Sequence, residues 1–238
     1  MADKRTDLCA SMLKYLGPAE KYCLQCPAEF SLAAGGKIVA IGDSITEAGG
    51  YLKNVDTVLA ARFPQRQAPP IVNVGISGQK AEDMVARFEK DVIREKPAVV
   101  TISVGVNDVW HRSGEAHDPQ VLTNYWKNVD AMVAMAQSAG IRVLLLTPTV
   151  IQENLHSGEN GRLEIYVAAE KQIARSRQCA LVDLHQMFLD ALEKQGARQG
   201  NWLTNDGVHM EPAGDAIMAI GVLRGLGIRD ELIAVRPD

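Results

Sequence analysis

The chain lacks the features that mark membrane proteins and nucleic-acid binders. No apolar run approaches the ~18 residues that a membrane span needs, and aromatic residues make up only 5% of the 238 positions. The net charge is −4 and the basic residues are scattered among acidic ones, so the sequence has no basic patch of the kind that binds nucleic acid. We therefore expect a soluble globular protein with no nucleic-acid partner and no membrane partner.

Cysteine is also scarce, at four residues. They are Cys9, Cys23, Cys26 and Cys179. Cys23 and Cys26 form a CxxC pair, but no second CxxC and no closely spaced pair of histidines completes a zinc site. No P-loop or GxGxxG segment follows an expected strand. The sequence therefore implies neither a metal ion nor a nucleotide cofactor, and we interpret the CxxC pair as structural or incidental thiols.

The N-terminal region lacks the regular alternation of strand-like and helix-like segments found in the rest of the chain. It begins MADKRTDLCASML, which has charges but no apolar core of signal-peptide length, so the chain as given is predicted to be cytoplasmic. A secreted or periplasmic protein whose signal peptide had been removed would look the same. Residues 1–36 are expected to form an arm with one short helix, capped by Thr6 or Asp7 and ending at Gly17, that packs on the domain or on another subunit.

From residue 37 onward, short apolar runs alternate with segments of helical periodicity. The expected strands are 37–42, 71–74, 98–104, 141–146 and 180–183. The expected helices are 52–63, 84–93, 122–133, 163–173, 187–192 and 212–226. Apolar runs of strand length are typical of parallel strands buried on both faces. The pattern predicts an α/β protein, with one parallel sheet covered by helices on both faces.

Polar or small residues follow three of the expected strands. Ser44 comes after the first, Gly78 after the second and Asn107 after the third. Because parallel strands all point the same way, these three residues are expected to meet at the carboxyl edge of the sheet, where open α/β folds bind their ligands. Asp206 and His209 lie just before the last helix.

These residue types fit acyl transfer by a serine nucleophile. An Asp three residues before a His can reach the imidazole Nδ1, which leaves Nε2 free to take the proton of a hydroxyl. We therefore expect Ser44 to be the nucleophile, His209 the base and Asp206 the residue that orients it. The backbone N–H groups of Ser44 and Gly78 and the side-chain amide of Asn107 are the expected donors of an oxyanion hole.

Other polar and aromatic residues near these segments have competing interpretations. Asp183 and His185 form a rival pair, but two residues apart at a strand end they point to opposite faces. Trp110 and Trp202 follow motif segments in loops, where an indole either stacks on a substrate or simply packs. Asp43 is expected to order the Ser44 turn by hydrogen bonding, and it joins the two tryptophans as a substrate-binding candidate. Three further histidines are expected to be solvated: His111, His117 and His156.

Four short segments carry a family resemblance. The segments GDSITE, NVGISG, GVND and DGVH occur in this order along residues 37–226. They resemble the four signature blocks of the SGNH (GDSL-type) hydrolase superfamily, with Ile45 where the family name has leucine. The resemblance implies a three-layer α/β/α sandwich over residues 37–238, with a five-stranded parallel sheet in the flavodoxin-like order 2-1-3-4-5. It also gives Ser44, Gly78, Asn107, Asp206 and His209 the roles inferred above.

A longer stretch is similar to bacterial acetylxylan esterases. It runs VNVGISGQKAEDMVARFEKDVIREKPAVVTISVGVNDVWH and includes Trp110. This similarity implies a serine esterase that removes acetyl groups from carbohydrate such as acetylxylan, with a small ester or acetylated saccharide as substrate. Acetylxylan esterases of this kind form oligomers, and the 1–36 arm is a candidate for a homo-oligomer contact that the residues alone do not decide.

Other functions remain open at this point. A general short-chain esterase, lysophospholipase or thioesterase of the same superfamily shares the blocks, although the polar segments 110–120 and 148–162 disfavour the long apolar groove of a lipase. A non-enzymatic glycan-binding descendant usually loses the nucleophile or the base, and this chain has both Ser44 and His209.

Overall fold

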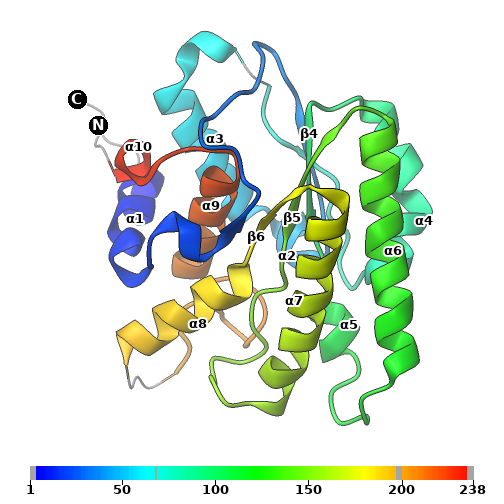
Figure 1. Ribbon diagram of the computed structural model, residues 1–238. Coiled ribbons are helices and arrows are strands. Elements are labelled where there is room, and N and C mark those ends of the chain that lie inside the picture. The colour runs from blue at the N-terminus through cyan, green and yellow to red at the C-terminus, as the bar shows by residue number, and fades with distance from the viewer. Residues whose placement is uncertain (1–3, 68, 197–199, 235–238) are drawn as a thin grey trace.

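A central β-sheet divides the molecule into layers, as Figure 1 shows for the computed structural model. The structure describes residues 4–67, 69–196 and 200–234. The parallel strands are β2 (Ile38–Ile41), β3 (Val72–Asn73), β4 (Val99–Ser103), β5 (Arg142–Leu146) and β6 (Ala180–Val182). They lie in the order β3-β2-β4-β5-β6. The parallel sheet that the sequence pattern predicts and the 2-1-3-4-5 order that the family resemblance implies are therefore confirmed.

The sheet has one strand more than predicted. β1 (Cys23–Leu24) pairs antiparallel with β6 and makes a sixth strand at that edge. The sequence does not predict β1, because a strand of two residues shows no alternating pattern. Gln25 ends the strand with a left-handed φ of 54°. The Cys26 thiol donates to the carbonyl of Leu181 at 3.4 Å, and all four cysteines are free.

One helical layer contains both ends of the described chain (Figure 1). Its helices are α1 (Lys4–Met12), α3 (Gly50–Arg62), α8 (Leu184–Gln195), α9 (Pro212–Gly225) and α10 (Asp230–Ala234). α9 packs against α1, α3 and α8 as well as β6. Because it is covered on so many sides, α9 is apolar around nearly its whole circumference, with Ile217, Met218 and Ile220 fully buried.

The opposite layer consists of α4 (Ala81–Asp91), α6 (Pro119–Ser138) and α7 (Gly158–Arg177), stacked side by side (Figure 1). α4 buries Ala81, Met84 and Phe88, which lie three to four positions apart on one face. α6 begins at Pro119 after the capping carboxylate of Asp118. Within the described residues, no helix has the length and apolar character that crossing a membrane would require.

Shorter elements complete the chain. Two five-residue helices, α2 (Ser44–Ala48) and α5 (Val106–Trp110), follow β2 and β4 at the carboxyl edge of the sheet. The 3₁₀ turns are η1 (Leu13–Tyr15), η2 (Ala19–Lys21), η3 (Pro64–Arg66) and η4 (Ile93–Glu95). The sequence predicted neither short helix, because five residues are too few to establish a period.

The N-terminal arm is fastened to the helical layer by polar contacts. The Tyr22 hydroxyl donates to the carboxylate of Asp190 at 2.5 Å and accepts from the backbone N–H of Gly17 at 2.6 Å. The Arg224 guanidinium donates to the carbonyl of Gly17 at 3.1 Å. The expected helix start is wrong, since Thr6 is buried inside a helix that already includes Lys4. In this chain, the arm packs on the rest of the protein, one of the two placements expected for it.

Candidate active site

Ser44 lies where the chain leaves β2 and enters α2. Asp43 caps this short helix, because its carboxylate accepts a hydrogen bond from the N–H of Ile45 at 3.0 Å. Burial raises the pKa of Asp43 to about 6, against the opposing influence of the Ile45 hydrogen bond and the His209 charge. Asp43 therefore orders the turn, as expected. With only 2% of it exposed, it does not fit the substrate-binding role for which it was also a candidate.

The imidazole of His209 bridges Ser44 and Asp206. Its Nε2 lies 2.9 Å from Oγ of Ser44, and its Nδ1 lies 2.6 Å from Oδ2 of Asp206. With the ring proton on Nδ1, the imidazole donates to Asp206 and accepts from the Ser44 hydroxyl. The structure thus brings together the three residues that the sequence predicts to act together, although Ser44 and His209 are 165 positions apart.

Asp206 is held as a carboxylate by its neighbours. Its Oδ1 accepts from the backbone N–H groups of Val208 at 3.0 Å and His209 at 2.8 Å. Burial acts to raise the pKa of Asp206, but the hydrogen bonds from the backbone and ring of His209 outweigh it and lower the pKa to about 2. Asp206 therefore stays ionised at neutral pH and keeps its orientation toward the imidazole.

The loop that carries this pair folds back on itself. Thr204 and Met210 form an isolated antiparallel bridge, and the N–H of Asn205 donates to the carbonyl of His209 at 2.9 Å. The turn passes through Gly207, whose φ of +96° is strained for any residue with a Cβ. The carbonyl of Gly207 accepts from the N–H of Gln152 at 2.7 Å, so the tip of the loop is tied to the segment after β5.

Gly78 lies in the segment after β3, and Asn107 lies in α5, which follows β4 at the same edge of the sheet as Ser44. Gly78 has φ +76°, which favours glycine, and a Cβ there would come no closer to a neighbouring atom than 4.0 Å, at Cε1 of His111. The amide Nδ2 of Asn107 donates to the carbonyl of Gln79 at 3.0 Å, so the Asn107 side chain is tied to the residue after Gly78. An amide nitrogen carries two hydrogens, and the second is free to donate elsewhere.

Asp108 contacts the start of α4, three residues after Gly78. Its carboxylate accepts from the N–H of Ala81, at the start of α4, at 3.3 Å. Burial raises the pKa of Asp108 to about 7, even though the Ala81 hydrogen bond and the Lys80 charge act to lower it. Asp108 therefore helps to fix the start of α4 next to the loop that carries Gly78.

Arg87 is a positioning residue that sequence reasoning missed. From α4, its guanidinium donates to the carbonyls of Val74 at 2.7 Å and Gly42 at 3.4 Å. Its Nε donates to the side chain of Gln79 at 2.6 Å. Arg87 therefore connects the ends of β2 and β3 with the residue that follows Gly78. In the sequence it is one polar residue among many on an amphipathic helix, so no pattern distinguishes it.

The two tryptophan candidates have different surroundings. The Trp110 ring lies edge-on to the His209 imidazole, with centroids 6.0 Å apart. The Trp202 ring lies edge-on to Tyr15 of the N-terminal arm, at 4.8 Å. Trp110 therefore lies next to the His209 imidazole, whereas Trp202 packs against the arm. His111, expected to be solvated, is exposed but close to Gly78, with its ring centroid 5.8 Å from that of Trp110.

The rival pair of Asp183 and His185 is structural. Asp183 caps α8 through the N–H of Gln186 and forms an ion pair with Lys171. The Nδ1 of His185 makes a short hydrogen bond with the backbone carbonyl of Thr149. Both residues are buried, Asp183 at 4% and His185 at 3% exposure. Neither belongs to the group formed by Ser44 and His209.

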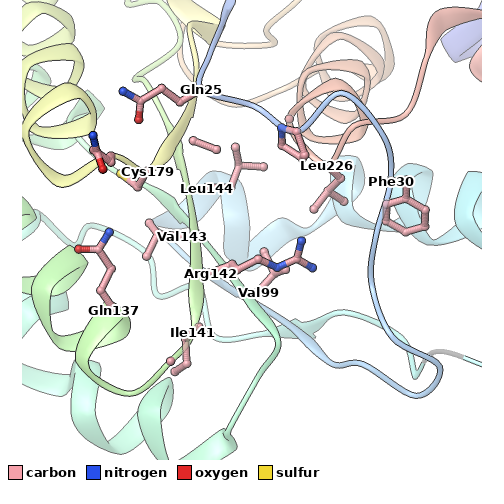
Figure 2. Close-up of a pocket in the computed structure, with 15 residues that line it drawn as sticks. Gln25, Phe30, Val99, Gln137, Ile141, Arg142, Val143, Leu144, Cys179 and Leu226 are labelled. Atoms are coloured by element: carbon pink, nitrogen blue, oxygen red, sulfur yellow. The ribbon is translucent and has the colours of Figure 1, made fainter.

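A cavity of about 450 Å³ lies elsewhere in the fold (Figure 2). It is lined by the first residues of three strands, Val99, Arg142 and Ala180, and so opens at the amino edge of the sheet, opposite Ser44. Cys179 also lines it, and burial raises the pKa of that thiol to about 11. In the described part of the chain, no three His, Cys, Asp or Glu side chains are grouped as a metal site would need.

Comparison with known proteins shows that the chain is similar to acyl hydrolases. The chain is 31% identical to the acetylxylan esterase of Geobacillus stearothermophilus over 216 residues, which cover 82% of this chain and 96% of that protein. The crystal structure of that esterase superposes with a TM-score of 0.72 at 29% identity, covering 84% of this chain and 97% of the other. Related structures are of catalytic mutants in which a serine, an aspartate or a histidine of that esterase is replaced by alanine.

A second solved structure gives a similar match. It is an α/β hydrolase from the metagenome of Lake Arreo, Spain, with a TM-score of 0.71 at 31% identity, covering 82% of this chain and 97% of the other. Residues 40–217 match the model of the GDSL-like Lipase/Acylhydrolase family. This span begins in β2 and ends in α9, and so includes all the segments that resemble the signature blocks. The chain therefore belongs to the GDSL-like lipase/acylhydrolase family and is a carboxylic ester hydrolase.

Proposed function

We propose that the protein is a serine esterase that removes acetyl groups from carbohydrate through an acyl-enzyme. The observation that carries the proposal is the hydrogen-bonded series from Asp206 through His209 to Ser44, at 2.6 and 2.9 Å. A serine hydroxyl becomes an effective nucleophile when a base beside it takes its proton. The same series also supports hydrolysis of other short-chain esters, so the substrate class rests on further observations.

In the acylation step, the Ser44 Oγ attacks the ester carbonyl as its proton passes to Nε2 of His209. The N–H groups of Ser44 and Gly78 and the amide of Asn107 then stabilise the negative charge on the carbonyl oxygen. When the tetrahedral intermediate collapses, the protonated imidazole gives its proton to the leaving alcohol oxygen, and the acyl group remains on Ser44.

Deacylation repeats these steps with water as the nucleophile. His209 takes a proton from the water, the hydroxide attacks the acyl-enzyme carbonyl, and the same donors stabilise the oxyanion. Collapse returns the proton to Oγ of Ser44 and releases the acid. Asp206, held ionised by its low pKa, orients the ring and stabilises the imidazolium in both halves of the reaction.

The openness of the site supports a bulky alcohol and a small acyl group. The side chains of His209 and Asp206 are 34% and 46% exposed, so the leaving-group side of the triad faces solvent. Trp110 beside His209 offers an apolar ring face of the kind on which sugars stack. In the segment after β5, Val150 and Ile151 are buried and do not line a long acyl groove. Together with the similarity to an acetylxylan esterase, these features favour acetylated saccharides.

A series of acyl-chain lengths tests the substrate class. We expect p-nitrophenyl acetate to be hydrolysed with a higher kcat/KM than the butyrate, and the octanoate to be the poorest substrate. Acetate release from acetylated xylo-oligosaccharides, measured by an enzymatic acetate assay, is expected to exceed release from simple alkyl acetates. A preference for octanoyl esters would instead support a lipase or thioesterase, and no hydrolysis of any ester would support a glycan-binding descendant.

A further inference from the structure

A single carboxylate fastens the segment that leads into the Asp206–His209 loop. Glu153 lies in the segment after β5, and its Oε1 accepts from the N–H of Leu203 at 2.6 Å. The same oxygen accepts from the N–H and the hydroxyl of Thr204 at 2.7 and 2.9 Å, and Oε2 accepts from the N–H of Trp202 at 2.8 Å. Hydrogen bonds to a carboxylate are stronger than those between neutral groups. Glu153 therefore concentrates four bonds on three consecutive residues.

The segment that Glu153 holds forms the base of the catalytic loop. Leu203 accepts from the N–H of Glu211 at 2.9 Å, and Thr204 bridges Met210 across the loop. Residues 205–209 form the tip of the loop beyond these two connections. The position of the His209 ring relative to Ser44 therefore depends in part on where residues 202–204 are held, together with the Gly207–Gln152 hydrogen bond at the tip of the loop.

Glu153 is itself anchored to α7. Asn160, which is 1% exposed, donates from Nδ2 to the carbonyls of Asn154 at 2.8 Å and Gln152 at 3.4 Å. Its Oδ1 accepts from the N–H of Ile151 at 2.9 Å. The residues on both sides of Glu153 are thus fixed to a helix of twenty residues that packs on α6. A continuous series of contacts runs from α7 through Glu153 to His209.

We propose that Glu153 is a positioning residue that holds the Asp206–His209 loop in register with Ser44. This inference rests on the proposed function, because it assigns a role in the same reaction. Glu153 acts through the backbone of residues 202–204, and not on the substrate. Its loss is expected to lower the fraction of molecules in which Nε2 of His209 reaches Ser44, and a displacement of about 1 Å can cost about 100-fold in rate.

Two substitutions at Glu153 are expected to lower kcat to different extents. Glu153→Gln keeps one oxygen for the three donors on Oε1 but places an amide N–H₂ opposite the N–H of Trp202. Glu153→Ala removes all four bonds. We expect kcat on p-nitrophenyl acetate to fall about tenfold in the Gln variant and about 100-fold in the Ala variant, with KM changed by less than about twofold. Glu95→Gln is the matched control, since Glu95 forms an ion pair with Lys37 at the opposite edge of the sheet.

Covalent labelling of Ser44 by an organophosphate separates positioning from folding. The labelling rate depends on the alignment of Ser44 and His209, whereas the endpoint counts folded molecules. We expect the labelling rate to fall by the same factors as kcat, with an unchanged endpoint in both Glu153 variants. A lower endpoint with a wild-type rate would mean that Glu153 only stabilises the fold, and a wild-type rate and endpoint in Glu153→Ala would also overturn the proposal.

The same experiment distinguishes failure of the two proposals. If the wild-type protein is labelled at a residue other than Ser44, or not labelled at all, the proposed function fails and the role of Glu153 fails with it. If the wild-type protein is labelled at Ser44 and both Glu153 variants react at the wild-type rate, only the positioning role fails.

Discussion

The two halves of the candidate site are held in place in different ways. Ser44, Gly78 and Asn107 lie in segments that follow β2, β3 and β4. The buried Asp43 and the partly buried Arg87 hydrogen-bond to the turns of this edge. Asp206 and His209 lie in a loop with no regular strand beneath it, and their side chains are 46% and 34% exposed. The positions of the residues in the first half are fixed mainly by the sheet. The second half depends on side-chain contacts from the segment after β5.

Because of this difference, we expect substitutions around the two halves to disturb the site in different ways. A change at a strand end must disturb the sheet before it moves Ser44, whereas a change at Glu153 acts directly on the loop that carries His209.

Loss of the nucleophile is expected to have the largest effect. Ser44→Ala removes the atom that forms the acyl-enzyme, so kcat on p-nitrophenyl acetate should fall by at least about 10⁴-fold. The melting temperature should change little, because Oγ of Ser44 has its hydrogen bond with a half-exposed imidazole. Ser176→Ala, at an exposed serine of α7, is the matched control and should keep full activity. Turnover near the wild-type level in Ser44→Ala would contradict the proposed mechanism.

The second prediction concerns the exposed half of the site. Asp206→Asn keeps the size of the side chain but favours the wrong tautomer of His209, so kcat should fall about 10⁴-fold or somewhat less. Steady-state kinetics from pH 5 to 9 checks this prediction. Because the pKa of Asp206 is lowered to about 2, the wild-type enzyme should lose no activity in that range through protonation of this carboxylate. A loss of less than about tenfold would show that Asp206 does not orient the base.

The third prediction addresses the half that is built on the sheet. Asn107→Ala removes one oxyanion donor and should lower kcat about 10²- to 10³-fold with little change in KM. The Asn107 amide also holds the carbonyl of Gln79, so unfolding must be measured in parallel. Asn107→Asp is informative in addition, since a negative charge facing the oxyanion should be at least as damaging as alanine. If kcat/KM fell only by as much as the folded fraction, the loss would come from unfolding, and this would contradict a direct role of Asn107 as an oxyanion donor.

The smallest effect is expected on stability and its dependence on pH. Burial raises the pKa of Asp108 to about 7, so the folded state keeps a proton that the unfolded chain releases near its ordinary pKa. The free energy of unfolding should therefore fall as pH rises from about 4 to 7. In Asp108→Asn, this decrease in the free energy of unfolding should be smaller by about 2 kcal/mol. Urea unfolding at pH 5 and pH 8 measures it. Asp7→Asn, at an exposed position on α1, should leave the slope unchanged.

The residues of the site could be predicted from sequence because each follows a recognisable local pattern. Ser44, Gly78 and Asn107 follow apolar runs, and the parallel sheet brings the ends of those runs to one edge. Asp206 and His209 are close enough in sequence to pair within one turn. Their meeting with Ser44 across 165 positions follows from the order of the strands, which the family resemblance supplied.

The residues that hold the site in place could not be predicted in the same way. Arg87 and Glu153 act through backbone carbonyls and N–H groups that lie far away in sequence, for example 45 positions from Arg87 to Gly42 and 50 from Glu153 to Leu203. In the sequence, each is a charged residue on a helix or in a polar segment, which is the pattern of a solvated surface. β1 was missed for a related reason, since two residues form a strand only because β6 lies beside them.

Mass spectrometry of the protein after reaction with an organophosphate is the most direct test that Ser44 and His209 act together. We expect one adduct per chain, located on the tryptic peptide that contains Ser44, and no adduct in Ser44→Ala. His209→Ala should slow its formation by several orders of magnitude. An adduct on another residue, or undiminished labelling of Ser44 without the imidazole of His209, would contradict the claim that these two groups act together.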